Sequence, residues 1–162
     1  MKKVIIINGT GGCGKDTFVS LVSKYAKVYN FSSIDAVKEL ATIIGWDGTK
    51  SEKDRKFLSD LKRLTTEYND FSFNSIKNAY EKFINSDNEI MFIHIREPEE
   101  IKRASDYFNA LTLLIKRENY DNISSNASDA NVDNYDYDYI INNTTLEDLE
   151  SRALEFSKKI MN

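Results

Sequence analysis

The chain has 162 residues, of which 41% are hydrophobic and 30% are charged, and its formal net charge is −4. This length and composition are typical of one globular domain with a substantial core, so we expect a single domain over residues 1–162. The negative charge argues against nucleic acid as the main partner. Because Cys13 is the only cysteine, an intrachain disulfide scaffold is excluded.

The N-terminal segment has the pattern of a buried strand. Apolar residues occupy consecutive positions over about residues 3–8, which predicts a central parallel strand covered on both faces. The run ends at Asn8 and Gly9, so it is too short for a signal peptide or a membrane span. We therefore expect a cytoplasmic protein that does not bind a membrane.

A glycine-rich segment follows this strand. Gly9 and Gly14 have the spacing of a phosphate-binding loop, in which backbone N–H groups face the phosphates of a nucleotide, and the ammonium of Lys15 is expected beside the β- and γ-phosphates. Asp16 stands where such loops usually carry a hydroxyl, and a carboxylate there suits Mg²⁺. The expected ATP-binding and Mg²⁺-binding residues are Gly9, Gly11, Gly12, Cys13, Gly14, Lys15, Asp16 and Thr17, with Asp16 as the metal ligand. Cys13 is either a thiol activated at a helix N-terminus or a variable loop position, and we favour the second interpretation.

Hydrophobic periodicity and cap residues predict the other elements. The expected helices cover about residues 18–25, 34–44, 51–64, 73–84, 98–107 and 144–160, and the further strands cover about residues 28–31, 89–95, 110–115 and 139–142. Ser51 is the expected cap of the third helix, and Thr144 or Thr145 that of the last, with Glu147 completing a capping box if Thr144 is the cap. Tyr25 is expected on a core-facing stripe.

The order of these elements defines the expected fold class. Alternating strands and helices after a phosphate-binding loop predict an α/β, three-layer P-loop NTPase fold, with a parallel five-stranded sheet and helices on both faces. Residues 119–138 have no helical or strand period and are expected to form a loop. Tyr135, Tyr137 and Tyr139 alternate with aspartates, a pattern explained either by entry into a partly exposed strand or by stacking on a base; we favour the strand.

Two arginines directly follow predicted strands. Arg96 follows the strand at residues 89–95, and Arg117 lies just after the strand at residues 110–115. Ligands of open α/β sheets bind at the carboxyl ends of the strands, so both arginines should lie on the same side as Lys15. Since phosphoryl transfer depends on positioning and charge neutralisation, we expect a small kinase with Lys15, Arg96 and Arg117 as its catalytic residues.

Four blocks of sequence carry a family resemblance. They are Gly14-Lys15-Asp16-Thr17, the segment 31–39, the segment 95–100 and the segment 138–149. In order and spacing they resemble the deoxynucleoside monophosphate kinases of bacteriophages and their bacterial relatives. The resemblance implies an adenylate-kinase-like fold that transfers the γ-phosphoryl group of ATP to a (deoxy)nucleoside monophosphate with Mg²⁺, and a lid at about residues 117–137 led by Arg117.

The residues expected to bind the acceptor are Asp35, Lys38, Arg55 and Arg96. Asp35 either orients the acceptor or a Mg²⁺-bound water, or caps a helix, and we favour the cap. Lys38 matches a lysine of the family by position, but it and Arg55 have the alternative of being ordinary surface charges. His94, the only histidine, stands where the family often has aspartate; it is either a core residue with satisfied hydrogen bonds, which we favour, or a proton acceptor beside the metal.

Two other functions remain open from the sequence. Related phosphate-loop kinases phosphorylate other small acceptors, such as dephospho-coenzyme A. A nucleotide-binding regulatory domain with little transfer activity also fits His94 and a lid that is poor in basic residues. The expected partners are small-molecule nucleotides, and the expected assembly is a monomer or a homodimer.

Overall fold

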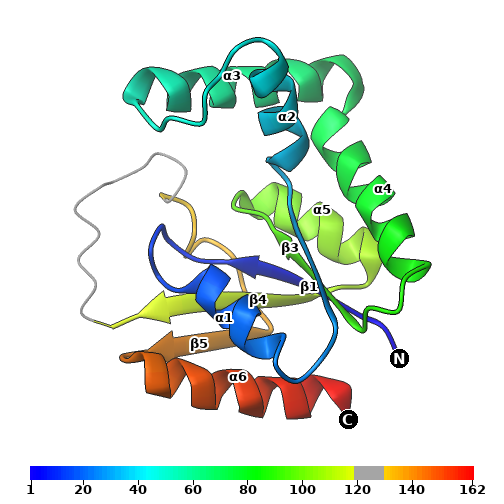
Figure 1. The fold of residues 1–162 in the computed structure, drawn as a ribbon, viewed down its shortest axis with the longest axis vertical. Helices are drawn as coiled ribbons and strands as arrows, with labels where there is room; N and C mark the ends of the chain where they lie inside the picture. The colour runs from blue at the N-terminus through cyan, green and yellow to red at the C-terminus, as the bar shows by residue number, and fades with distance from the viewer. Residues whose placement is uncertain (119–129) are drawn as a thin grey trace.

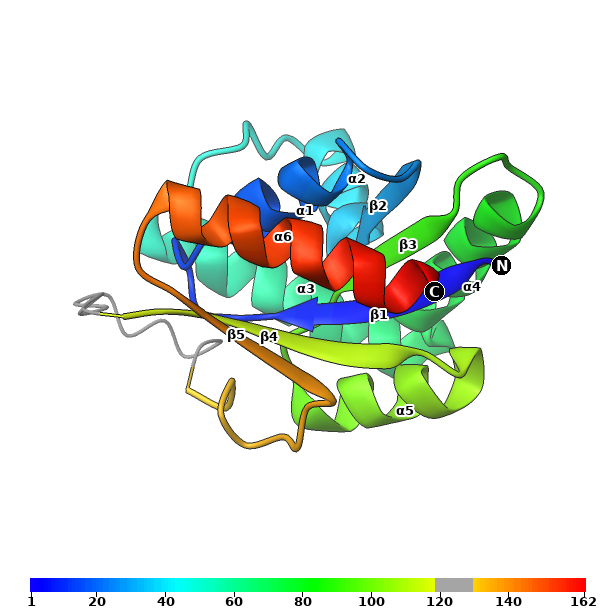
Figure 2. The same ribbon diagram turned by 90° about the horizontal axis from the view of Figure 1, so that it is seen from below.

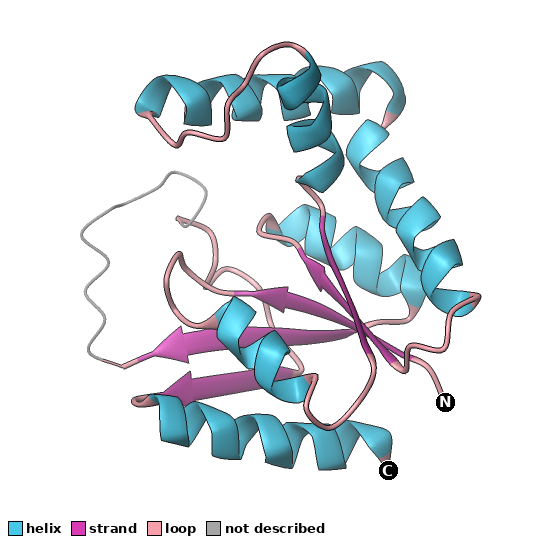
Figure 3. Ribbon diagram, viewed as in Figure 1, coloured by secondary structure: helices cyan, strands magenta, loops and turns pink. Residues whose placement is uncertain are grey.

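The structure is a computed structural model that describes residues 1–118 and 130–162. In these residues one parallel sheet, whose strands are magenta in Figure 3, has the strand order β2-β3-β1-β4-β5. The strands are β1 (Lys3–Asn8), β2 (Val28–Ser32), β3 (Ile90–His94), β4 (Leu111–Arg117) and β5 (Tyr139–Asn143). The helices are α1 (Lys15–Val22), α2 (Asp35–Ile43), α3 (Glu52–Asn69), α4 (Phe71–Ile84), α5 (Pro98–Phe108) and α6 (Leu146–Met161). The expected α/β fold with a parallel five-stranded sheet is confirmed.

Both faces of the sheet are covered by helices, which explains the unbroken apolar runs of the central strands. Ile5 and Ile7 pack in one core with residues of α1 and α6, whereas Ile6 packs in a second core with residues of α4 and α5. Figure 2 shows α1 and α6 on one side of the sheet and α5 on the other. The expected three-layer arrangement is therefore present.

The sheet has a topological switch point between β1 and β3. These two strands are neighbours, with Ile7 beside His94, but the chain leaves β1 toward β2 and leaves β3 toward β4 on the opposite side. In open α/β sheets the ligand crevice lies at such a point, outside the carboxyl ends of the strands. The segments that follow Asn8 and His94 therefore flank the expected crevice.

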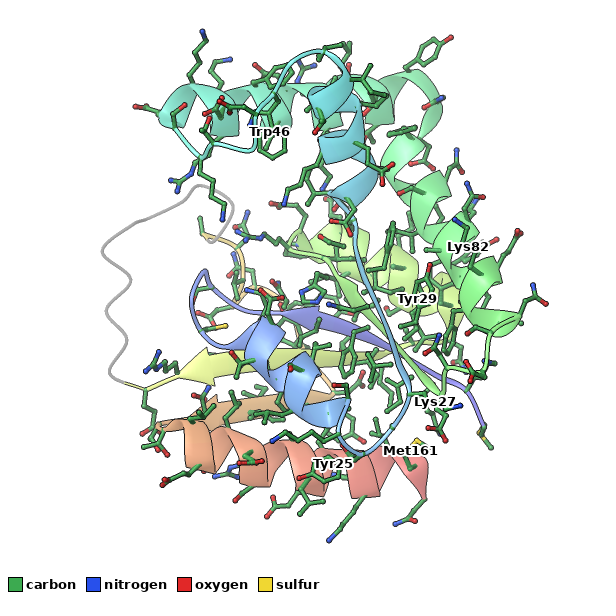
Figure 4. All side chains as sticks on the ribbon, in the orientation of Figure 1. Tyr25, Lys27, Tyr29, Trp46, Lys82 and Met161 are labelled. Atoms are coloured by element: carbon green, nitrogen blue, oxygen red, sulfur yellow. The ribbon has the colours of Figure 1, made fainter. Side chains whose placement is uncertain are left out.

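Residues 35–69, which comprise α2, α3 and their connection, form a helical lobe beyond the sheet (Figure 1). None of the residues of α3 is buried. The helix begins with the expected cap, because the Ser51 hydroxyl accepts a hydrogen bond from the backbone N–H of Asp54 and the Asp54 carboxylate accepts one from that of Ser51. Figure 4 shows Trp46 on this lobe, at the opposite end of the molecule from Tyr25 and Met161.

Two ion pairs connect the lobe to α5. Asp70 separates α3 from α4 with a left-handed φ of 57°, and its carboxylate accepts two hydrogen bonds from the Arg103 guanidinium. Lys62 Nζ lies 2.9 Å from a carboxylate oxygen of Glu100. These contacts join α3 and its junction with α4 to α5 through charged groups.

Some details differ from the expectations. Tyr25 is 44% exposed and lies beyond the end of α1, so its placement on a core-facing stripe was wrong. Thr145 is the cap of α6, since its hydroxyl accepts the N–H of Asp148, so the capping box of Thr144 with Glu147 is not formed. Of the expected loop, residues 119–129 lie outside the described residues, and residues 130–138 form turns and bends.

None of the helices in the described ranges has the length and apolar character needed to cross a bilayer.

Candidate phosphate-binding site

The segment between β1 and α1, residues 9–14, forms a tight loop that only glycine can build at two positions. Gly9 has a φ of 153°, and a Cβ atom there would lie 2.5 Å from the carbonyl oxygen of Ile115 and 2.6 Å from Sγ of Cys13. Gly14, at the N-terminal cap of α1, has a left-handed φ of 103°. A side chain at either position would therefore force the loop away from β4 or strain it.

The ammonium of Lys15 lies inside this loop. Its Nζ donates hydrogen bonds to the carbonyl oxygens of Gly9 and Thr10, the latter at 3.0 Å, and lies 4.0 Å from Sγ of Cys13. The Cys13 side chain is only 1% exposed and packs in the core on the α1 side of the sheet. Cys13 is thus a core residue. Its place in the core explains a small apolar side chain at this position better than either sequence interpretation does.

Two buried asparagines at strand ends hold the loop, and the sequence analysis did not select them. Asn8 Oδ1 accepts the N–H of Gly9, and its amide donates to the carbonyl of Arg96 at 3.1 Å and to the hydroxyl of Tyr137 at 2.9 Å. Asn143 Nδ2 donates to the carbonyls of Cys13 and Lys116 at 3.3 and 2.7 Å. These bonds link the phosphate loop and the end of β1 to Arg96, to Lys116 of β4 and to Tyr137 before β5. A polar amide at the end of an apolar strand is the signal by which both could have been found.

His94 lies among the charged residues of the predicted site. It ends β3 and is partly buried, and its Nε2 lies 2.8 Å from Oδ1 of Asn30 on β2. Burial lowers the pKa of His94 below its usual value. Lys15 and Arg96 also lower this pKa, while Asp16 and Asp35 raise it. Four predicted site residues therefore contribute to the electrostatic environment of one imidazole.

Arg117 lies on the other side of the phosphate loop. It is the exposed last residue of β4, and a small cavity of about 160 Å³ is lined by Thr10, Lys116 and Arg117 together with Ile115, Val132 and Asp133. Lys116 forms an ion pair with Asp133 at 2.6 Å. The expectation that both strand-end arginines lie on the Lys15 side of the sheet is thus met in placement, while their catalytic roles stay predictions.

The residues expected to bind the acceptor lie on the lobe side. The Asp35 carboxylate accepts the backbone N–H of Ser32 at 2.9 Å and makes no side-chain cap bond, so our preferred interpretation as a helix cap was wrong. This bond fixes the turn between β2 and α2. Lys38 is partly buried on α2 and Arg55 is exposed on α3. Their roles in binding an acceptor stay predictions.

The tyrosines that alternate with aspartates have separate positions. Tyr137 is buried and its hydroxyl donates to the carbonyl of Val132 at 2.7 Å. Burial raises the pKa of the Tyr137 phenol, which keeps this donor protonated. Tyr139 is the first residue of β5, as the strand interpretation expected, whereas Tyr137 precedes the strand and is buried instead of partly exposed.

The described part of the chain has no cluster of side chains that forms a metal site by itself. No group of three or more His, Cys, Asp or Glu side chains there could hold a metal ion. Asp16 and Thr17 are exposed in the first turn of α1. A divalent ion at this position would therefore need most of its ligands from nucleotide phosphates and water, which is how Mg²⁺ is usually bound beside nucleotides.

Comparison with solved structures identifies proteins that share this fold. TT1252 from Thermus thermophilus is 17% identical with a TM-score of 0.54, over 99% of this chain and 98% of that one. A protein described as a "putative kinase" from Chloroflexus aurantiacus j-10-fl is 11% identical with a TM-score of 0.54, over 99% and 96% of the two chains. For a thymidylate kinase from Ehrlichia chaffeensis the values are 15% and 0.47, with 98% coverage of each chain. No protein-family model and no curated protein sequence matches the chain.

Proposed function

We propose that the protein is a kinase that transfers the γ-phosphoryl group of ATP to a (deoxy)nucleoside monophosphate. The observation that carries this proposal is the position of Lys15. Its ammonium lies within a glycine loop at the switch point of the sheet, and Asn8, directly before this loop, donates a hydrogen bond to the carbonyl of Arg96. A lysine and an arginine at one crevice can neutralise the charge that phosphoryl transfer develops.

The described residues fit the triphosphate of ATP. The absence of side chains at Gly9 and Gly14 lets the backbone approach an anion, and the N-terminus of α1 adds a positive partial charge. Asp16, in the first turn of α1, is the residue that would hold Mg²⁺, directly or through water. When bound, this ion would neutralise charge on the phosphates.

The acceptor is assigned to the space between the phosphate loop and the helical lobe. Asp35 at the start of α2 and Lys15 both contribute to the electrostatic environment of His94, whose strand lies between β1 and β2. Lys38 and Arg55 supply positive charge farther along the lobe for the acceptor phosphate. The family resemblance in the sequence supports this assignment, and the shared fold with the protein described as a "putative kinase" supports the kinase function.

An acceptor panel tests the proposal. The purified protein is incubated with ATP and Mg²⁺ and, separately, with each common ribonucleoside and deoxyribonucleoside monophosphate and with dephospho-coenzyme A. Products are identified by mass. We expect equal amounts of ADP and one nucleoside diphosphate. Phosphorylation of dephospho-coenzyme A alone would reject the nucleotide acceptor, and ATP binding without any phosphorylated product would reject the kinase.

A further inference from the structure

His94 lies at the carboxyl end of β3, between the strands that lead to the phosphate loop and to the lobe. Lys15 and Asp16 act on it from α1, Asp35 acts from α2, and Arg96 acts from the segment after β3. His94 pairs with Ile7 of β1 on one side and Ser32 of β2 on the other, directly before the loops that follow these strands. A substrate that reaches from the phosphate loop to α2 would therefore pass over this residue.

Asn30 determines which ring nitrogen carries the proton. Its side-chain carbonyl oxygen lies 2.8 Å from Nε2 of His94, and a carbonyl oxygen only accepts hydrogen bonds. Nε2 must therefore be the donor. Because burial lowers the pKa of His94, the ring carries a single proton at neutral pH, and Nδ1 keeps its lone pair.

The second ring nitrogen, Nδ1, is not fully buried. Every fully buried side-chain nitrogen or oxygen in the described residues has a hydrogen-bond partner. Among those residues the partner of the His94 ring is Asn30, through Nε2. Nδ1 therefore keeps some exposed surface.

We propose, on the basis of the kinase function proposed above, that Nδ1 of His94 accepts a hydrogen bond from a hydroxyl group of the acceptor substrate. A neutral nitrogen lone pair repels an anionic phosphate oxygen but suits an O–H donor. The cationic groups for phosphate are nearby in Lys15 and Arg96, so the two kinds of recognition are divided between different side chains. The sugar of a nucleoside monophosphate provides such a hydroxyl, and Asn30 acts as the positioning residue of the imidazole.

A cycle of two proteins and two ligands tests this contact. The wild-type protein and His94→Phe are each combined with the best nucleotide acceptor and with its dideoxy analogue, which lacks the sugar hydroxyls. If no acceptor is phosphorylated, AMP and dideoxy-AMP are used. The dissociation constants are measured by calorimetry in the presence of ADP and Mg²⁺, and kcat/KM is measured where there is turnover.

We expect the wild-type protein to bind the dideoxy analogue about tenfold more weakly, as for one lost hydrogen bond to a partner left unpaired. His94→Phe should lose the same factor with the hydroxyl-bearing ligand and none with the analogue. His94→Gln, which keeps an acceptor oxygen, should recover part of the affinity. Asn30→Leu should show an intermediate loss, whereas Asn78→Leu, the same change at an exposed position of α4, should show none.

Equal losses with both ligands, or no loss with either, would overturn the inference. The cycle measures binding, whereas the acceptor panel measures transfer. A failure of the kinase proposal is therefore distinguished from a failure of the inference about His94. A second measurement covers a variant that does not fold. As the only histidine, His94 gives one ¹H–¹⁵N imidazole pattern in the wild-type protein, which should be that of the Nε2–H tautomer at neutral pH; the Nδ1–H tautomer or a doubly protonated ring would contradict the inference.

Discussion

The phosphate loop and the helical lobe are built in different ways. The loop lies between β1, whose residues Val4–Asn8 are all buried, and α1, which contributes Phe18 and Val22 to the core with no exposed surface. In the lobe, α2 buries only Val37 and Ala41, and α3 buries none of its 18 residues. Packing therefore stabilises the loop, whereas capping and ion pairs stabilise α3.

This difference indicates how the two regions can behave when a substrate binds. A loop fixed by Asn8, Asn143 and the core presents the same anion site before and after binding. A helix with little buried apolar surface has a small free energy of local opening, so it can move at little cost. We expect the phosphate loop to be preorganised and the lobe to adapt to the acceptor.

The largest contrast is expected from the same truncation made in both regions. Phe18 has no exposed surface and packs against Phe92 and Phe156, with ring centroids 6.4 and 5.5 Å away. Phe18→Ala should lower the free energy of unfolding by about 3–5 kcal/mol. Phe57→Ala, on the partly buried face of α3, should cost about 1 kcal/mol. Urea unfolding measures both, and equal losses would show that the lobe is as well packed as the core.

A matched pair of glycine substitutions tests the rigidity of the loop. Gly9→Ala places a methyl group against the carbonyl of Ile115, so it should cost about 1–3 kcal/mol of stability and weaken ATP binding more than tenfold. Gly48 also has a left-handed φ, of 89°, but a Cβ there meets no atom within 4 Å. Gly48→Ala should therefore cost about 1 kcal/mol and leave the ATP dissociation constant unchanged in calorimetry. If Gly9→Ala bound ATP with the dissociation constant of the wild-type protein, the assignment of residues 9–14 as a phosphate-binding loop would be contradicted.

Substitution of Arg103, in the ion pair at the α3–α4 junction, tests how much this contact stabilises the lobe. Arg103 donates to Asp70, and its guanidinium lies 3.8 Å from the ring centroid of Phe73. The Arg103 and Asp70 side chains are 52% and 32% exposed, so Arg103→Met should cost only about 0.5–1 kcal/mol, yet speed hydrogen exchange in α3 more than in the sheet. Arg63→Met removes an exposed pair within α3 and should have less effect. If Arg103→Met sped hydrogen exchange equally in α3 and in the sheet, the ion pair would have no local role in stabilising α3.

The smallest expected effect is a pH dependence of the free energy of unfolding that arises from His94 at the carboxyl end of β3. The pKa of His94 is lowered in the folded protein by burial, so the unfolded chain binds more protons below the ordinary histidine pKa of about 6.5. Stability from this group is complete above that pH and is lost as the pH falls through the folded-state value. His94→Phe should remove this dependence in pH-resolved unfolding. Since the lobe has no histidine, a dependence that survives the substitution would have another origin.

Sequence patterns predicted the sheet and the loop because both depend on local features. Unbroken apolar runs identify strands that are covered on both faces, and the glycine spacing before Lys15 identifies the loop without knowledge of its neighbours. Strand ends in a parallel sheet share one edge, so the placement of Arg96 and Arg117 on the Lys15 side also followed from chain order.

The remaining features depend on contacts between distant segments. Asn8 becomes a bridge only because β3 and the segment before β5 bring Arg96 and Tyr137 to it. The bond from Ser32 to Asp35 replaced the expected helix cap because the turn after β2 needed an acceptor for its own N–H group. Periodicity gave α3 correctly as a helix but contained no information on whether its apolar stripe has a partner.

The rate of phosphoryl transfer by the Lys15→Ala variant tests the central claim most directly. Transfer of the γ-phosphoryl group from ATP is followed by product mass with the best acceptor and saturating Mg²⁺, for the wild-type protein, Lys15→Ala and Lys82→Ala. Figure 4 shows Lys82 on α4, on the side of the molecule away from the phosphate loop. Lys15→Ala should transfer at least about 10²–10³-fold more slowly with an unchanged circular dichroism spectrum, and Lys82→Ala should match the wild type. Wild-type transfer rates in Lys15→Ala would contradict a phosphate-loop kinase.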